Sequence, residues 1–311
     1  MPARVAVVQK PPVLLDLKAT IERALESLEE SAAKGSNLVV FPEAYLPGYP
    51  TWIWRLRPGG DMALSAEIHA SLRANAVDID RGALEPLCKA AQRHGVTVVC
   101  GMSEIDGRFS GTTLYNTAVT IGPDGAILNR HRKLMPTNPE RMVWGQGDAG
   151  GLRVVDTPVG RVGVLICWEN YMPLARYALY AQNIDIYVAP TWDCGDNWLA
   201  SMRHIAREGG CWVVSLATAL QGNDVPPAFP DRDALFKPDD WLCDGDAVIV
   251  EPSGRPLAGP LHREKGILYG DIDIEKARRA RRSLDVTGHY ARPDIFKLEV
   301  RRGAMSPVDF T

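Results

Sequence analysis

The chain has 311 residues, 46% of them hydrophobic and 23% charged, so it is long enough and apolar enough to bury a substantial core. Its 35 basic and 38 acidic residues give a formal net charge of -3, and this balance gives no reason to expect nucleic acid or an anionic membrane as a partner. Because no apolar run approaches the roughly 20 residues of a membrane-spanning helix and no secretory signal pattern is found, we expect a cytoplasmic protein with no membrane partner.

Strand, helix and strand alternate along the first half of the chain. Short apolar runs predict buried strands, and an apolar stripe with helical spacing from residue 17 predicts a helix that Gly35 ends. The expected elements are, in order, a strand at 5–9, this helix, a strand at 37–41, a helix at 84–94, a strand at 96–100 and a hairpin with strands at 115–121 and 126–130. This alternation is typical of a layered α/β protein.

The second half repeats the alternation. The expected elements are strands at 152–155 and 162–166, a helix at 173–182, a strand at 184–189, a helix at 197–208 and strands at 212–216, 246–250 and 266–272. Residues 221–240 contain four prolines, so we expect a long surface loop in which neither strand nor helix persists. No linker or internal repeat is found, which favours a single domain.

Six cysteines are scattered along the chain: Cys88, Cys100, Cys167, Cys194, Cys211 and Cys243. They form no CxxC pair and have no closely spaced histidines, so the pattern indicates neither a zinc site nor a disulfide framework. We therefore expect no metal and no cofactor.

Three reactive side chains stand where predicted strands end, the place where α/β sheets commonly carry their chemistry. Glu43 follows a buried strand among prolines and aromatic residues, so desolvation would raise its pKa and suit a general base; alternatively it braces a loop. Lys133 ends the hairpin, where a solvated basic run is the alternative. Cys167 lies between a buried strand and a helix that begins near Pro173, and its alternative is an inert buried thiol.

Together, these segments resemble the Glu-Lys-Cys triad of the nitrilase superfamily. Phe-Pro-Glu ends at Glu43, Arg-Lys-Leu surrounds Lys133 and Ile-Cys-Trp-Glu surrounds Cys167, in the order, loop contexts and approximate spacing of that triad. The resemblance continues through residues 139–148 and 285–294 and covers nearly the whole chain. Cys-Trp-Glu-Asn-Tyr, which begins at the cysteine, is similar to the nitrilase branch.

The resemblance implies a four-layer-forming α-β-β-α sandwich, in a single carbon-nitrogen hydrolase domain over residues 1–311. Its core would extend over about 4–275, and the tail at 276–311 would lie in oligomer contacts or on the surface. The resemblance also implies a homo-oligomer, a dimer or a higher assembly. Whether dimers assemble further into spirals or filaments is left open.

Further site residues follow from the same resemblance. Glu140 matches a second family glutamate that positions Lys133 and the substrate; the alternative is a surface acid. We expect Tyr49, Trp168 and Trp192, with the proline-rich loop, to line an apolar substrate pocket, although aromatic residues are also common in cores. Asn138-Pro139 stands where many nitrilases carry a histidine, which leaves the substrate range open.

The implied activity is that of a nitrilase, which converts a small organic nitrile to a carboxylic acid and ammonia. Cys167 would form a thioimidate and then a thioester, and the neighbouring Lys133 ammonium would favour the nucleophilic thiolate. An aliphatic amidase or an N-carbamoyl amidohydrolase would use the same triad. A catalytically silent binding or assembly protein is the remaining alternative. The class of nitrile, aliphatic, aromatic or arylacetonitrile, and an amide by-product stay open.

Overall fold

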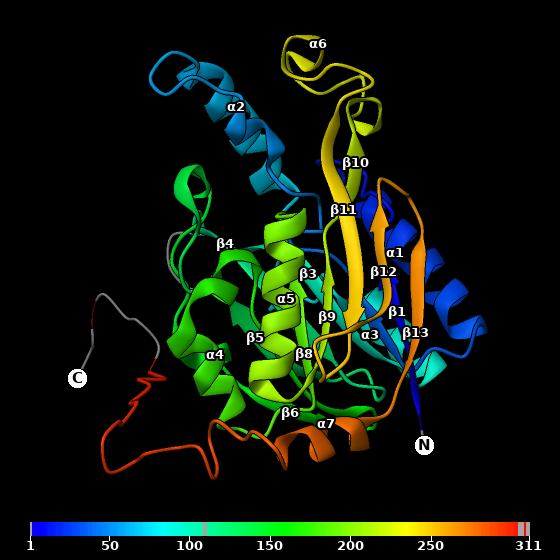
Figure 1. The fold of residues 1–311 in the computed structure, drawn as a ribbon. Coiled ribbons are helices and arrows are strands. Elements are labelled where there is room, and N and C mark those ends of the chain that lie inside the picture. Colours follow the sequence, from blue (N-terminus) through cyan, green and yellow to red (C-terminus); the bar gives the residue numbers. More distant parts are fainter. Residues whose placement is uncertain (1, 108–110, 304–307, 309–311) are drawn as a thin grey trace.

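Two β-sheets form the centre of the molecule, with helices on their outer faces (Figure 1). The computed structural model describes residues 2–107, 111–303 and 308, so part of the expected tail at 276–311 lies outside the described residues. None of the helices in the described part of the chain has the length and apolar character needed to cross a membrane.

The first sheet has six strands, in which β1, β2 and β3 run parallel and the remaining strands pair antiparallel at its two edges. Its spatial order is β13 (Ile267–Ile272), β1 (Ala3–Val8), β2 (Leu38–Val40), β3 (Thr97–Ile105), β4 (Leu114–Ile121) and β5 (Ile127–Arg132).

The second sheet has seven strands, with β7, β8 and β9 parallel at its centre. Its order is β10 (Ala219–Gln221), β11 (Trp241–Val250), β9 (Trp212–Leu216), β8 (Ile186–Pro190), β7 (Gly160–Val164) and β6 (Val154–Thr157), and β12 (Pro256–His262) pairs with β11.

The helices complete four layers. The outer face of the first sheet packs against α1 (Leu17–Ala33) and α3 (Glu85–His94), and that of the second against α4 (Pro173–Tyr180) and α5 (Asp196–Gly209). Because side chains alternate along a strand, Val5 and Val7 of β1 face the second sheet while Ala6 and Val8 pack with α1. The mixed α/β sandwich with two sheets flanked by helices is as predicted.

Several elements differ from the sequence prediction. The structure adds β10, β12, α2 (Met62–Ala74) and α7 (Ile274–Arg281), and it begins β11 at Trp241 rather than residue 246. The expected loop at 221–240 holds a four-residue helix, α6 (Arg232–Leu235), so the prediction that no helix persists there was wrong over this turn. Short 3-10 helices lie at Thr51–Trp54, Asn138–Met142, Ala149–Gly151, Cys167–Tyr171 and Gly222–Asp224.

Physical reasons account for the differences. Only Ile68 and Leu72 of α2 are buried, so its apolar stripe is too short to recognise in the sequence. β12 carries Gly259-Pro260 at its centre, a pair that argues against a strand, and its side chains are largely exposed because it lies at an edge.

Candidate active site

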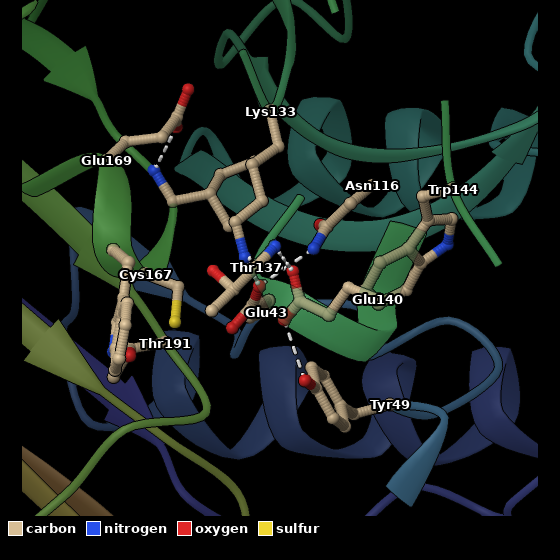
Figure 2. A network of polar contacts seen from close by, with 12 residues as sticks. Glu43, Tyr49, Asn116, Lys133, Thr137, Glu140, Trp144, Cys167, Glu169 and Thr191 are labelled. Atoms are coloured by element: carbon tan, nitrogen blue, oxygen red, sulfur yellow. Dashed lines mark hydrogen bonds and ion pairs between the residues drawn. The ribbon is translucent and has the colours of Figure 1, made fainter. Parts of the chain in front are cut away.

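The predicted triad residues lie at one end of the sandwich, where strands of both sheets finish. Glu43 follows β2 and Lys133 follows β5 in the first sheet, whereas Cys167 follows β7 in the second. Figure 2 shows their side chains directed toward one another. The structure therefore brings together residues that are far apart in the sequence.

The Lys133 ammonium joins two carboxylates. Its Nζ donates to Glu43 Oε1 at 2.8 Å and to Glu140 Oε2 at 2.7 Å, and all three side chains are buried (Figure 2). Burial alone lowers the pKa of Lys133, but Cys167, Glu43 and Glu140 outweigh it and hold the pKa above its ordinary value. Lys133 is therefore a fixed positive charge, rather than the exposed basic residue of the alternative reading.

Glu43 is the carboxylate with an unsatisfied oxygen. Its Oε1 accepts from Asn116 Nδ2 at 2.7 Å as well as from Lys133, whereas its buried Oε2 has no hydrogen-bond partner among the residues that the structure describes. Burial raises the pKa of Glu43 to about 7; Lys133 opposes this shift and the Glu140 charge adds to it. A carboxylate with a free oxygen and a pKa near neutrality is suited to exchange protons with a bound molecule.

Glu140 is held from both sides within the 3-10 helix Asn138–Met142. Its Oε2 accepts from the Thr137 backbone N–H at 2.7 Å in addition to Lys133, and its Oε1 accepts from the Tyr49 hydroxyl at 2.7 Å. Burial and the Glu140 charge hold the pKa of Tyr49 well above its ordinary value, so the hydroxyl stays a donor. Glu140 is thus a buried partner of Lys133 and not a surface acid.

Cys167 begins the 3-10 helix Cys167–Tyr171 with a φ of 53°, a conformation that costs energy in a residue with a side chain. Only 4% of the residue is exposed. Burial raises the pKa of its thiol, Glu43 adds to the shift, and Lys133 lowers it incompletely. Lys133 thus acts in the direction that favours the thiolate, but burial and Glu43 outweigh it, so the resting thiol keeps its proton.

The side chains of Glu43, Glu140 and Cys167 offer ligand atoms that all lie within 4.8 Å of one another, a grouping also seen in metal sites. Here the Lys133 ammonium already contacts both carboxylates and supplies a positive charge at that position. The spacing leaves the thiol and the carboxylates within reach of one small molecule bound between them.

A cavity of about 140 Å³ opens onto Cys167 and Glu140. Its wall includes the three aromatic residues expected to line a substrate pocket, Tyr49, Trp168 and Trp192. Three further residues that were not expected there also line it: Trp54, Thr137 and Asp193. The residues that line this cavity do not include the proline-rich segment; its Phe229 packs on Trp52, and its part in a substrate pocket stays a prediction.

Aromatic rings and polar contacts hold the wall of this cavity. Tyr49 stacks on Trp192 with ring centroids 4.2 Å apart, and Trp54 Nε1 donates to the Tyr49 hydroxyl at 3.1 Å. Trp168 Nε1 donates to Asp193 Oδ2 at 2.9 Å. Asp193 directly follows the expected pocket residue Trp192, so its place in the wall could have been predicted from the sequence. The contribution of Trp54 depends on how distant segments pack, so no sequence pattern indicated it.

The carbon-nitrogen hydrolase family model matches residues 4–282 of the chain. The aliphatic nitrilase of Sinorhizobium fredii (strain HH103) is 44% identical, over 98% of this chain and 97% of that protein. Nitrilase 2 of Arabidopsis thaliana is 42% identical, over 99% of this chain and 91% of that protein. A solved carbon-nitrogen hydrolase from Helicobacter pylori G27 has a TM-score of 0.71 at 21% identity, covers 95% of this chain and 97% of its own, and supports the fold alone.

Proposed function

The chain belongs to the carbon-nitrogen hydrolase family, and we propose that it acts as a nitrilase, converting a small organic nitrile to the carboxylic acid and ammonia. The observation that carries the proposal is the buried cluster in which Lys133 joins Glu43 and Glu140 beside the Cys167 thiol. Relatives named nitrilases, 42–44% identical over nearly the full chain, support the choice of substrate.

In the first step, the Cys167 thiol adds to the nitrile carbon. Because burial keeps the thiol protonated at rest, a base must remove its proton, and Glu43 has a free oxygen and a pKa near neutrality for this task. The proton then passes from Glu43 to the nitrile nitrogen. The product is a thioimidate on Cys167, with no net change in protons.

In the second step, Glu43 takes a proton from water as the water oxygen adds to the thioimidate carbon. The tetrahedral intermediate carries a hydroxyl, an amino group and the sulfur. Lys133 and the backbone N–H of Trp168, which lies in the first turn of a helix, stabilise the charge that develops there. The amino group forms when Glu43 passes the water proton on to the nitrogen. The hydroxyl proton then moves through Glu43 to this amino group as the carbon-nitrogen bond breaks, which releases ammonia and leaves the carbonyl group of a thioester.

In the last step, a second water activated by Glu43 attacks the thioester and releases the carboxylic acid and the thiol. Glu140 holds Lys133 in place through these steps, because it contacts Nζ and is itself fixed by the Tyr49 hydroxyl. Tyr49, Trp168 and Trp192 form the wall against which the substrate packs.

An amidase would share the thioester half of this reaction and the same cluster. The substrate is therefore decided by measuring ammonia and carboxylate release from nitriles and from the matching amides. We expect release from nitriles by the wild-type protein and none by Cys167→Ala. Release from amides alone would reject the nitrilase assignment and leave the cluster as that of an amidase.

We also propose that the chain forms a homo-oligomer. A cavity of about 780 Å³ lies between α4 and residues 286–298, away from Cys167. It is bordered by apolar side chains that are largely exposed in the single chain: Leu174, Tyr290, Ile295 and Phe296. An apolar surface of this kind is typical of a contact with another protein chain.

A cytoplasmic location remains part of the proposal. All six cysteines are free thiols, as is usual in the reducing cytoplasm.

A further inference from the structure

Glu169 is a fully buried carboxylate that the proposed mechanism does not use. Its oxygens accept from the Ile166 N–H at 2.6 Å, the Leu134 N–H at 2.6 Å and His131 Nε2 at 2.9 Å. The two backbone N–H groups can only donate, and each meets a different oxygen of Glu169, so both carboxylate oxygens act as acceptors.

The partners of Glu169 flank the proposed catalytic residues. Ile166 directly precedes Cys167, and Leu134 directly follows Lys133. Since β7 and β5 belong to different sheets, one carboxylate joins a turn of each sheet at the positions next to the proposed nucleophile and ammonium.

The other hydrogen bonds of the Lys133 turn and of the Cys167 turn do not connect the two turns with each other. The Lys133 N–H donates to the Asn116 carbonyl at 2.7 Å, within the first sheet. Asn170 Nδ2 donates to the Cys167 carbonyl at 2.7 Å, within the Cys167 turn. Among the hydrogen bonds of the described residues, those of Glu169 are the ones that connect residues 131–134 with residues 166–169.

We infer that Glu169 is a positioning residue that fixes the Cys167 thiol relative to the Lys133 ammonium, with His131 as its anchor in the first sheet. His131 Nε2 lies 2.9 Å from the carboxylate, a contact that needs the proton on Nε2, and no described residue is a hydrogen-bond partner of its buried Nδ1, so the ring serves this one contact. The role rests on the proposed function, because it acts through the proposed nucleophile and ammonium.

The test compares Glu169→Gln with the wild-type protein by kcat and KM for a hydrolysed nitrile and by the pH dependence of Cys167 alkylation with iodoacetamide. A glutamine places an NH₂ group against a backbone N–H and pushes the two turns apart. Since a displacement of about 1 Å costs about 10²-fold in rate, we expect kcat to fall by about 10²-fold with KM within about threefold. Alkylation should move to higher pH, because Lys133 then lowers the pKa of the thiol less.

Asp185→Asn is the matched control. Asp185 is also buried, accepts a backbone N–H from Arg161 at 3.1 Å and pairs with Arg281 at 3.0 Å, but at the opposite end of β7 from Cys167. We expect it to lower the unfolding temperature without changing kcat or the alkylation profile. Equal kcat losses in the two variants would overturn the inference, because they would reflect general destabilisation.

His131→Phe provides a second route should Glu169→Gln fail to fold. It removes one donor and leaves the two backbone N–H groups, so we expect kcat to fall by about tenfold. Wild-type kcat and alkylation in this variant would contradict the anchoring role.

The two readouts separate the inference from the proposed function. Alkylation needs no nitrile, so a shifted alkylation profile in a protein that hydrolyses no nitrile would support the positioning role and reject the function. Normal nitrile hydrolysis with an unchanged alkylation profile in Glu169→Gln would support the proposed function and reject the positioning role of Glu169.

Discussion

At the scale of single residues, the environment of Glu43 determines the chemistry that the site supports. Its carboxylate is buried beside another carboxylate, and one ammonium does not fully compensate for the lost solvation. The same burial keeps the Cys167 thiol protonated at rest. A neutral thiol and a carboxylate with a pKa near 7 form a pair that can exchange one proton when substrate arrives.

This environment predicts the pH dependence of the proposed reaction. Glu43 must be ionised to act as a base, and burial raises its pKa to about 7, so kcat/KM should increase with pH through about 7 and fall below it. Because the charges of Lys133 and Glu140 both act on Glu43, the midpoint reports the whole cluster. The measurement is a pH profile of kcat/KM for ammonia release. An acid limb near 4.5, the ordinary value of a glutamate, would contradict the role of Glu43.

The sequence was informative about the residues whose neighbours along the chain form recognisable motifs. Glu43, Lys133, Glu140 and Cys167 each follow a strand or lie in a short turn, and their proximity follows from the sandwich. Their catalytic roles stay predictions. The contacts of Glu169 with Leu134 and His131 could not be predicted, because they depend on two turns meeting across the sheets.

At the scale of elements, β3 makes room for the turn that carries Glu43. A Cβ at Gly101 would lie 2.2 Å from the Pro42 carbonyl oxygen and 2.9 Å from Glu43 Cα. Since these are backbone atoms, no side-chain rotation relieves the contact. Gly101 therefore permits the close approach of β3 to this turn.

Gly101→Ala should therefore displace Glu43. We expect kcat to fall by about 10²-fold and the free energy of unfolding to fall by about 1–3 kcal/mol, as in overpacked cores. Ammonia release and urea unfolding measure the two effects. The control is Gly266→Ala, whose Cβ would meet nothing closer than 3.7 Å; it should keep wild-type kcat and lie within about 0.5 kcal/mol of wild-type stability. Wild-type kcat in Gly101→Ala would contradict this account of the turn.

Elements with strong apolar patterns were predictable, and those defined by their neighbours were not. The buried strands β1, β2, β8 and β9 and the helices α1, α3 and α5 follow from their apolar runs and stripes. β12 forms because β11 offers it an open edge, although its own residues disfavour a strand. The open edge of β11 depends on distant parts of the chain, so it cannot be predicted from the residues of β12 alone.

At the scale of the whole molecule, the sandwich leaves the outer face of α4 partly uncovered. Leu174 is 66% exposed and Phe296, across the cavity from α4, is 76% exposed. Apolar side chains this exposed along one groove favour a contact between copies of the chain, in line with the expected homo-oligomer.

Leu174→Glu should disrupt such an assembly, because it would bury a charge in the contact. By light scattering during size-exclusion chromatography, we expect the wild-type protein to have the mass of a dimer or larger assembly and the variant a smaller mass. The control Met62→Glu, at a residue 57% exposed on α2, should keep the wild-type mass. A monomeric wild-type protein would rule out the proposed oligomer.

The most direct test of the central claim, that Cys167 attacks a nitrile, is the ammonia and carboxylate released from one nitrile by three proteins: wild type, Cys167→Ala and Cys194→Ala. Cys194 is a half-buried thiol that follows the pocket residue Asp193, so it is a matched control. The account predicts equal amounts of ammonia and acid from the wild type and Cys194→Ala, and none from Cys167→Ala. Undiminished release by Cys167→Ala, or no release by the wild type from any nitrile, would contradict it.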